Sequence, residues 1–276
     1  MEKFQLSLLF KIIGIGSASG LVYHDDKLYL ISDSSTFLYE YTIPTEKLNK
    51  IALVKNAQDN VAKKDKPDFE AIALKGNSIV IIGSGSTEKR NRLFKYRPIS
   101  GTIKESDLTD YYQRFKTELK ITADELNIEG LIDQDKNVYF FQRGNGIDGK
   151  NGIIHSKGNH PDSPLTFIPF DLPKIKNVAA TFTDAILVED KIWFLASAED
   201  TASTYLDGEV LGSIIGRIDA KTLKVEFTQQ ISATNKFEGL TLYKQSADKI
   251  EFLLCEDTDS EVLESDIYKL VIDKTK

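Results

Sequence analysis

Asn127-Ile128-Glu129-Gly130-Leu131 is one of five similar phrases that recur along the chain. In each phrase a polar or acidic residue is followed by Gly or Ala and then by an aliphatic residue. The other four phrases are Ser17-Ala18-Ser19-Gly20-Leu21, Asp68-Phe69-Glu70-Ala71-Ile72, Phe182-Thr183-Asp184-Ala185-Ile186 and Lys236-Phe237-Glu238-Gly239-Leu240. The key positions are spaced by 51, 59, 55 and 54 residues, and they are Ser19, Glu70, Glu129, Asp184 and Glu238. A nearly fixed period of this size is typical of a propeller or solenoid.

Each repeat contains short runs that are rich in β-branched and aromatic residues and are bounded by turn residues. In the first repeat these runs are residues 21–23, 27–32, 36–43 and 48–54. Such runs indicate strands and hairpins, and four antiparallel strands make a propeller blade. The sequence therefore predicts an all-β protein, a five-bladed β-propeller with four antiparallel strands per blade.

The N-terminal run supplies a strand that the last repeat lacks. The fifth repeat ends one strand short, and residues 4–12 form a strand-like run that belongs to no other repeat. We expect this run to become the outer strand of the last blade and to close the ring. Residues 1–276 then form a single propeller domain. The alternative, a six-bladed propeller, requires a sixth key phrase, and the sequence contains none.

One insertion interrupts the regular pattern. Residues 107–115 carry helical spacing after a capping-type Asp107, and we expect a short helix between the last two strands of the second repeat. This insertion accounts for the longest of the repeat spacings.

Composition narrows the possible partners. The 276 residues carry a formal net charge of -7, which argues against nucleic acid and anionic membranes, because both require basic patches. Cations remain plausible ligands.

The single cysteine, Cys255, lies in an apolar run and allows no intramolecular disulfide. No run approaches the roughly 18 apolar residues of a membrane span. We expect a monomer located in the cytoplasm.

The key positions predict a polar site at the centre of the ring. The first strand of each blade lines the channel of a propeller, so Ser19, Glu70, Glu129, Asp184 and Glu238 are expected to converge at one end. Carboxylates this close repel one another unless a cation or protons neutralise them. Oxygen ligands favour Ca²⁺, and Mg²⁺ less, as a metal bound by the four acids. The alternative is a channel neutralised by ion pairs, for which Arg143 is a candidate.

A second set of polar residues follows the second strand of each repeat. Each of the five turns after a second strand can be explained by ordinary turn chemistry. Taken together, the polar residues of these turns predict the rim of a pocket. The candidate ligand-binding residues are Asp33, Ser84, Arg143, Asn145, Glu199, Asp200 and Asp257. The turn Gly83-Ser84-Gly85-Ser86, followed by Lys89, Arg90 and Arg92, is also a weak candidate for cradling an anion.

These residues resemble known propeller families over essentially the whole chain. The key phrases resemble the bacterial SdiA-regulated family of five-bladed propellers, and they are more similar to a mainly Bacteroidetes family of unknown function that is related to the phytase-like propellers. The similar segments include Gly83-Ser84-Gly85-Ser86, Gln142-Arg143-Gly144-Asn145, Ala198-Glu199-Asp200, Tyr205, Asp207-Gly208-Glu209 and Gly212-Ser213. The resemblance implies a channel cation, calcium, on Glu70, Glu129, Asp184 and Glu238, and no settled activity. Ser19 departs from the acidic pattern, which puts a symmetric metal site in doubt.

Three functional hypotheses follow. The first is a binding module that holds a divalent cation and a small molecule or peptide at the channel mouth, without catalysis. The second is a metal-dependent hydrolase of phosphoesters, esters or lactones, with Glu129 or Glu238 as general base and Arg143 holding an anionic substrate. Phytase-like activity would be an analogy at the level of the fold only. The third is a purely structural channel.

Overall fold

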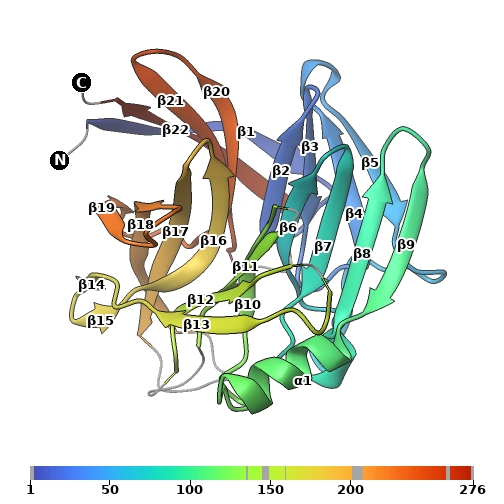
Figure 1. Cartoon of the computed structure of the whole chain (residues 1–276). Helices are drawn as coiled ribbons and strands as arrows, with labels where there is room; N and C mark the ends of the chain where they lie inside the picture. Colours follow the sequence, from blue (N-terminus) through green and yellow to red (C-terminus); the bar gives the residue numbers. More distant parts are fainter. Residues whose placement is uncertain are drawn as a thin grey trace.

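The computed structural model is a ring of five antiparallel sheets with four strands each (Figure 1). It describes residues 3–134, 136–144, 149–158, 160–200, 208–258 and 262–274. The first blade contains β2 (Gly20–His24), β3 (Lys27–Ile31), β4 (Phe37–Thr42) and β5 (Lys47–Ala52). The second contains β6 (Phe69–Lys75), β7 (Ser78–Gly83), β8 (Arg92–Arg97) and β9 (Thr102–Asp107). The predicted five-bladed propeller is confirmed.

The remaining three blades follow the same plan. The third contains β10 (Ile128–Gln134), β11 (Asn137–Gln142), β12 (Gly152–Ser156) and β13 (Leu165–Pro169). The fourth contains β16 (Thr181–Val188), β17 (Lys191–Asp200), β18 (Glu209–Asp219) and β19 (Val225–Ser232). The fifth contains β20 (Phe237–Gln245), β21 (Lys249–Glu256), β22 (Glu264–Asp273) and β1 (Phe4–Ile13). As predicted, the N-terminal strand closes the ring, because β1 pairs antiparallel with β22.

The other elements are short. A two-stranded hairpin, β14 (Lys174–Ile175) and β15 (Val178–Ala179), precedes the fourth blade, and 3-10 turns span Ile43–Thr45 and Glu88–Arg90. The ten-residue helix α1 (Thr109–Glu118) confirms the expected helix but follows the fourth strand of the second blade instead of preceding it. The carboxylate of Asp107 accepts the backbone N–H of Thr109 at 2.7 Å, which explains why the helix begins there. No described helix is long and apolar enough to cross a membrane.

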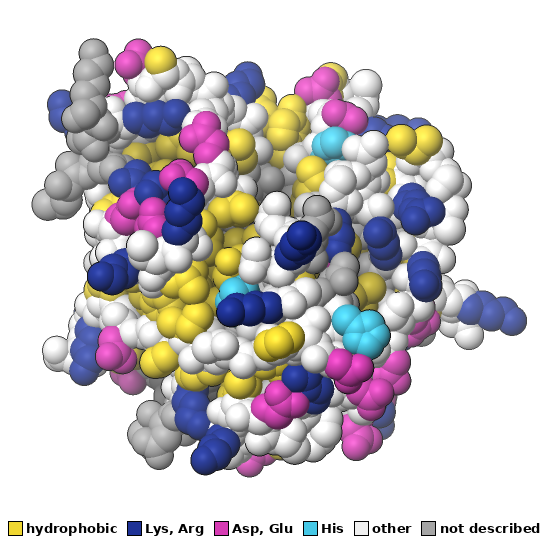
Figure 2. Space-filling view, viewed as in Figure 1, with side chains coloured by type: hydrophobic (Ala, Val, Ile, Leu, Met, Phe, Trp, Pro, Cys, Tyr) yellow, Lys and Arg dark blue, Asp and Glu magenta, His cyan; other side chains and the backbone are white. Residues whose placement is uncertain are grey.

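The core is divided among the five seams between blades. Each seam contains one cluster of buried apolar side chains. Successive residues of a strand point to opposite faces, so Phe140 packs toward the second blade and Phe141 toward the fourth. Both faces of the inner strands are therefore apolar, which is why these strands read as continuous hydrophobic runs. Figure 2 shows apolar side chains in the hollows and charges of both signs scattered over the surface.

The first strands of the blades surround the central channel, and glycine lets them approach. A Cβ atom on Gly239 would lie 2.5 Å from Leu21 Cδ2 in the first blade, and a Cβ atom on Gly20 would lie 2.9 Å from Ile72 Cγ2 in the second. Contacts of this length do not occur between real side chains. The Gly or Ala in the key phrase is therefore explained by crowding between blades, as the sequence predicts.

Candidate functional site at the channel mouth

A β-bulge lies within the key phrase of four of the five blades. In the third blade Ile128 pairs with Gln142 and Gly130 with Phe141, so that Glu129 has no partner on β11. The same shift leaves Glu70, Thr183 and Glu238 unpaired in the second, fourth and fifth blades. A bulge turns one side chain away from the regular alternation and is common beside functional sites. It places these side chains at the start of the inner strands.

The register of β16 corrects the expected position of Asp184. Asp184 pairs with Leu195, as Gly130 pairs with Phe141, so Thr183 and not Asp184 is equivalent to the three glutamates. The carboxylate of Asp184 accepts the backbone N–H groups of Ala185 and Leu240, each at 2.7 Å. It is 2% exposed, and burial raises its pKa well above the usual range. Asp184 thus joins the fourth and fifth blades.

The two hydroxyl residues of the ring also join neighbouring blades. Thr183 Oγ1 donates to the carbonyl of Phe237 at 2.7 Å, immediately before Glu238 in the next blade. Ser19 Oγ donates to the carbonyl of Phe69, immediately before Glu70. The three glutamates are therefore the only bulge residues of the described ring with ionisable side chains. Ser19 and Thr183 instead form hydrogen bonds to the neighbouring strands β6 and β20, which carry Glu70 and Glu238.

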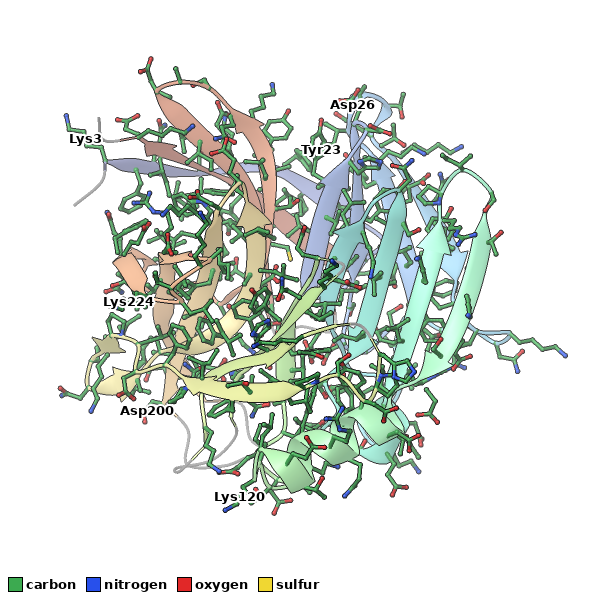
Figure 3. All side chains as sticks on the ribbon, in the orientation of Figure 1. Lys3, Tyr23, Asp26, Lys120, Asp200 and Lys224 are labelled. Atoms are coloured by element: carbon green, nitrogen blue, oxygen red, sulfur yellow. The ribbon has the colours of Figure 1, made fainter. Side chains whose placement is uncertain are left out.

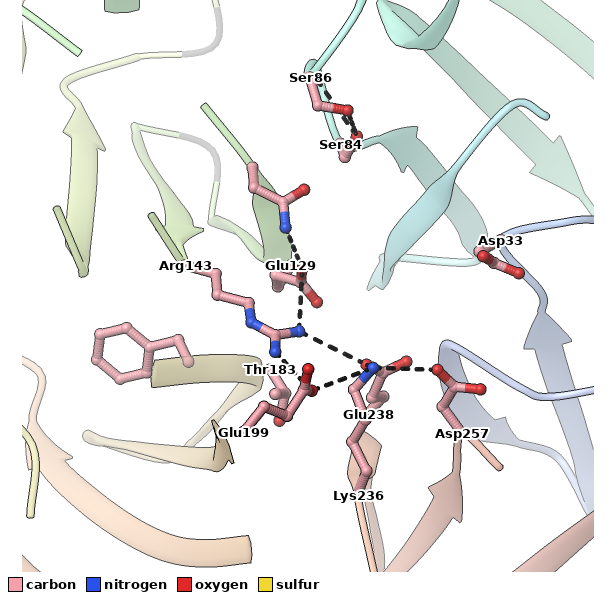
Figure 4. A network of polar contacts seen from close by, with 12 residues as sticks. Asp33, Ser84, Ser86, Glu129, Arg143, Thr183, Glu199, Lys236, Glu238 and Asp257 are labelled. Carbon is pink, nitrogen blue, oxygen red and sulfur yellow. Dashed lines mark hydrogen bonds and ion pairs between the residues drawn. The ribbon is translucent and has the colours of Figure 1, made fainter. Parts of the chain in front are cut away.

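Arg143 is surrounded by acids from three blades (Figure 4). Its Nη2 donates to Glu199 Oε1 at 2.6 Å, and its Nη1 lies 3.6 Å from Glu129 Oε1 and 3.8 Å from Glu238 Oε1. Burial raises the pKa of Glu129 to about 6, although the positive charges of Arg143 and Lys236 oppose the increase. Asn127 also donates to Glu129 Oε1 at 2.5 Å. The predicted residues Glu129, Arg143, Glu199 and Glu238 therefore meet in one network.

Lys236 extends this network to the fifth blade. Its ammonium lies 2.9 Å from Glu238, 3.2 Å from Glu199 and 3.2 Å from Asp257. Burial raises the pKa of Glu238 well above its usual range despite this neighbour. Burial would raise the pKa of Glu199 as well, but Arg143 and Lys236 bring it below the ordinary value. Both cations are thus largely neutralised by the protein's own carboxylates.

A second acidic group lies between the first and second blades. Ligand oxygens of Asp33, Asp68 and Glu70 all lie within 4.8 Å of one another, and this is the one such group found among the described residues. Of the four predicted metal ligands, it includes Glu70 only. Lys66 Nζ contacts both Asp33 and Asp68, the latter at 2.8 Å. Burial together with the charge of Asp68 raises the pKa of Glu70 well above its usual range.

The glycine-rich turn holds a carboxylate of the protein itself. Asp68 Oδ2 accepts hydrogen bonds from Ser84 Oγ at 2.5 Å and from Arg90 Nη1 at 2.8 Å. The hydroxyl of Tyr112 in α1 donates to the carbonyl of Gly83 at 2.6 Å. A Cβ atom on Gly85, whose φ is +76°, would lie 2.7 Å from the ring of Tyr112. Gly85 therefore makes room for α1, and Asp68 already occupies the expected anion cradle.

One predicted ligand-binding residue that the structure describes, Asp200, is not part of this network. Asp200 is exposed at the end of β17, opposite Glu209. Figure 3 shows it at the same end of the molecule as Lys120, whereas Tyr23 and Asp26 lie at the opposite end. Asn145 lies outside the described residues, as do Tyr205 and Asp207.

Three contributors to the site were missed from the sequence, namely Lys66, Asp68 and Lys236, whereas Arg90 was expected there as part of the anion cradle. Asp68 and Lys236 each lie two residues before a key glutamate. Both residues directly precede the first strand of their blade, β6 or β20, so their place in the key phrase is a signal that could have found both. Lys66 lies in the loop before β6, and the pattern of the sequence gives no comparable signal for it.

Comparisons with known proteins define the family and the fold. A family described as "Family of unknown function (DUF6929)" matches residues 14–272. No curated protein matches the sequence. The Malassezia sympodialis allergen Mala s 1 is 10% identical, with a TM-score of 0.55 over 96% of each chain. Myxococcus xanthus glutaminyl cyclase is 11% identical, with a TM-score of 0.53 over 97% of each chain. At these identities the likeness concerns the fold alone, and the expected relation to SdiA-regulated and phytase-like propellers stays a prediction.

Proposed function

The protein belongs to the DUF6929 family, and we propose that it is a binding protein that takes up a cation at the acidic mouth of its channel. Ca²⁺ is the first candidate, on Asp33, Asp68 and Glu70. A small molecule or peptide bound there would present a positively charged group. This proposal shifts the expected metal ligands from the four key acids toward the first and second blades.

The balance of charge favours a cation over an anion. Among the described residues, the two acidic groups at the channel mouth contain seven acids and four basic side chains. The acids are Asp33, Asp68, Glu70, Glu129, Glu199, Glu238 and Asp257, and the basic side chains are Lys66, Arg90, Arg143 and Lys236. An anionic ligand would have to compete with these carboxylates for the same cations. A positively charged ligand would instead relieve the repulsion among the acids.

Glu70 is the observation that carries the proposal. The other six acids each contact a lysine or arginine, whereas within the described part of the chain no hydrogen bond or ion pair reaches the side chain of Glu70. Its side chain is half-buried, and the negative charges of Asp68 and Glu129 disfavour its ionisation. Carboxylate oxygens are the ligands that Ca²⁺ prefers. A cation beside Glu70 would supply the missing partner.

Lys66 competes with such a cation. Its ammonium already contacts two of the three carboxylates, so a metal ion has to displace it. Replacing Lys66 by Met removes this competitor while preserving much of the apolar stem. We therefore expect Lys66→Met to bind Ca²⁺ more tightly than the wild type.

Calorimetric and thermal titrations with Ca²⁺ and Mg²⁺, after dialysis against EDTA, test the proposal. A ligand of the native state at 100 times its Kd stabilises the fold by about 2.7 kcal/mol. We expect a calcium-dependent rise in Tm for the wild type, its loss in Glu70→Gln, and its retention in Glu46→Gln, which changes an exposed acid. No binding by the wild type and by Lys66→Met would contradict the proposal and favour a self-neutralised structural channel.

The pKa of Glu129 supports hydrolysis as a second candidate function. A carboxylate with a pKa of about 6 is suited to act as a general base near neutral pH. Glu238 stands beside the same guanidinium, and Arg143 would orient an anionic substrate. A panel of phosphoesters, esters and lactones tests this hypothesis. The hydrolase hypothesis predicts that the wild type and Glu46→Gln turn over at least one of these substrates and that Glu129→Gln does not. The absence of turnover across the panel would exclude hydrolysis of these substrates.

A further inference from the structure

Exposed apolar side chains concentrate on the N-terminal strand. Eight large hydrophobic residues of the described chain are exposed, and four of them are on β1. The four are Phe4 (36% exposed), Leu8 (55%), Leu9 (38%) and Ile13 (64%). β1 is also the outermost strand of its blade, so one edge of its backbone has no neighbouring strand. An apolar strand at a sheet edge is a template for pairing with another strand.

The outer strands of the other blades carry the residues that usually prevent such pairing. Lys47 and Lys50 are in β5, Lys104 and Glu105 are in β9, Pro169 ends β13, and Glu226 is in β19. Charged residues and proline at an edge discourage strand addition.

β1 lacks this protection over most of its length. Lys11 is the one charged residue in its ten positions. Its own chain neutralises that charge, because Glu264 lies 2.6 Å and Asp266 3.7 Å from Lys11 Nζ. The edge of β1 therefore presents a nearly uncharged surface to an incoming strand.

We propose that β1 pairs antiparallel with β1 of a second copy of this chain. The segment Phe4-Gln5-Leu6-Ser7-Leu8 has the same alternation in both directions. In the antiparallel register centred on Leu6, Phe4 faces Leu8 of the second copy, Gln5 faces Ser7, and Leu6 faces Leu6. A two-fold axis requires this kind of self-complementarity, and a cross-strand pair of like character is stabilising.

The geometry of β1 fixes the length of the pairing. A β-bulge lies between Leu8 and Phe10 and divides the strand into two regular runs, of which Phe4–Leu8 is the first. Within it Phe4, Leu6 and Leu8 pair with Ile272, Leu270 and Tyr268 of β22. Leu6 packs against the apolar cluster between the fourth and fifth blades. Lys11 lies beyond the bulge and therefore outside the five paired residues. The two fifth blades then form one eight-stranded sheet.

Sedimentation velocity and light scattering on the full chain test the interface. We expect the wild type to be a dimer, and Leu8→Lys to be a folded monomer because each copy places the new charge at the interface. Ile99→Lys is the matched control, since Ile99 is 88% exposed in the second blade, far from β1 in the sequence. It should remain dimeric. A wild type that is monomeric at concentrations of tens of micromolar, or a Leu8→Lys variant that remains dimeric, would overturn the proposal.

A disulfide measures the register directly. In Leu6→Cys the two new thiols face each other across the axis, with Cα atoms about 4.5–5.5 Å apart, within the range of a disulfide. In Ser7→Cys the thiol faces Gln5 of the second copy, and its own equivalent is about 7–8 Å away. The native Cys255 is fully buried and does not interfere. Oxidation should link Leu6→Cys into a covalent dimer and leave Ser7→Cys unlinked; the reverse result would contradict the register.

Discussion

Glu70 shows how a single residue couples the site to pH. Below its ordinary pKa of 4.5, the glutamic acid is protonated in both the folded and the unfolded chain and has no effect on stability. Above this value the unfolded chain loses the proton, while the folded chain keeps it until the raised pKa is passed. The wild type is therefore progressively destabilised between the two pKa values, and the loss is constant above the higher one.

We expect Glu70→Gln to be more stable than the wild type near neutral pH in the absence of metal. The gain should be absent below pH 4.5 and should grow by about 1.4 kcal/mol per pH unit over the interval in which only the folded state holds the proton. Urea unfolding from pH 4 to pH 8 measures the difference. A gain of equal size at every pH would show that titration of Glu70 is not its cause.

Arg143 balances several buried acids at once. Arg143→Met leaves Glu129, Glu199 and Glu238 with one cation, Lys236, instead of two. Removing one partner of a buried ion pair costs about 3–5 kcal/mol, and we expect a loss of this order at pH 7 that shrinks as the acids are protonated at lower pH. Lys89→Met breaks an exposed pair with Asp65 and should change stability little. Chemical denaturation at pH 7 and pH 5 compares the two variants.

At the scale of elements, the turn after β7 depends on glycine because α1 packs on it. Gly85 combines a φ of +76° with the close approach of Tyr112. Gly76 has a φ of +56° but no atom within 4 Å of the place where a Cβ would stand. The two positions therefore separate the cost of backbone strain from the cost of crowding.

We expect Gly85→Ala to destabilise the protein by about 2–3 kcal/mol, since it adds overpacking to strain. Gly76→Ala should cost about 1 kcal/mol, from strain alone. Denaturant unfolding monitored by circular dichroism measures both losses. Equal losses in the two variants would mean that α1 moves aside at no cost.

At the scale of the whole molecule, the ring closes through strands from the two ends of the sequence. β1 pairs with β22 along its length, and the backbone N–H of Asp273 donates to the carbonyl of Lys3 at 3.0 Å. Figure 1 shows β1 and β22 side by side. The ring is therefore closed by the pairing of β1 with β22. A chain that begins and ends elsewhere but keeps this pairing should close the ring as well.

We expect removal of residues 1–13 to expose β22 and the apolar residues that β1 covers, and to abolish cooperative unfolding. A circular permutant that joins residue 274 to residue 3 by a short linker and opens at Gly101 retains every strand pair. Because Gly101 stands in an open turn between β8 and β9, the permutant should unfold cooperatively like the wild type. Thermal melts compare the two proteins. A truncated protein with an unchanged melt would show that β1 does not stabilise the ring.

The sequence by itself determined the architecture of this protein. Apolar runs at a nearly constant period fixed five blades of four strands, and the unassigned run at residues 4–12 fixed the closure, because each run has to be buried against a neighbour. Local patterns also located Glu70, Glu129 and Glu238, since a Gly or Ala and then an aliphatic residue follow each of them.

The tertiary structure alone decided the chemistry of the channel mouth. The side chains of a strand alternate with a period of two, so a shift of one residue in alignment exchanged Asp184 for Thr183 at the channel position. Lys66 and Arg90 reach the acids from loops, and ion pairs between residues such as Arg143 and Glu199 join different blades. Side-chain charges act through space and leave no periodic mark in the sequence, so only the closed ring reveals which acids are paired and that Glu70 stands beside Asp33 and Asp68.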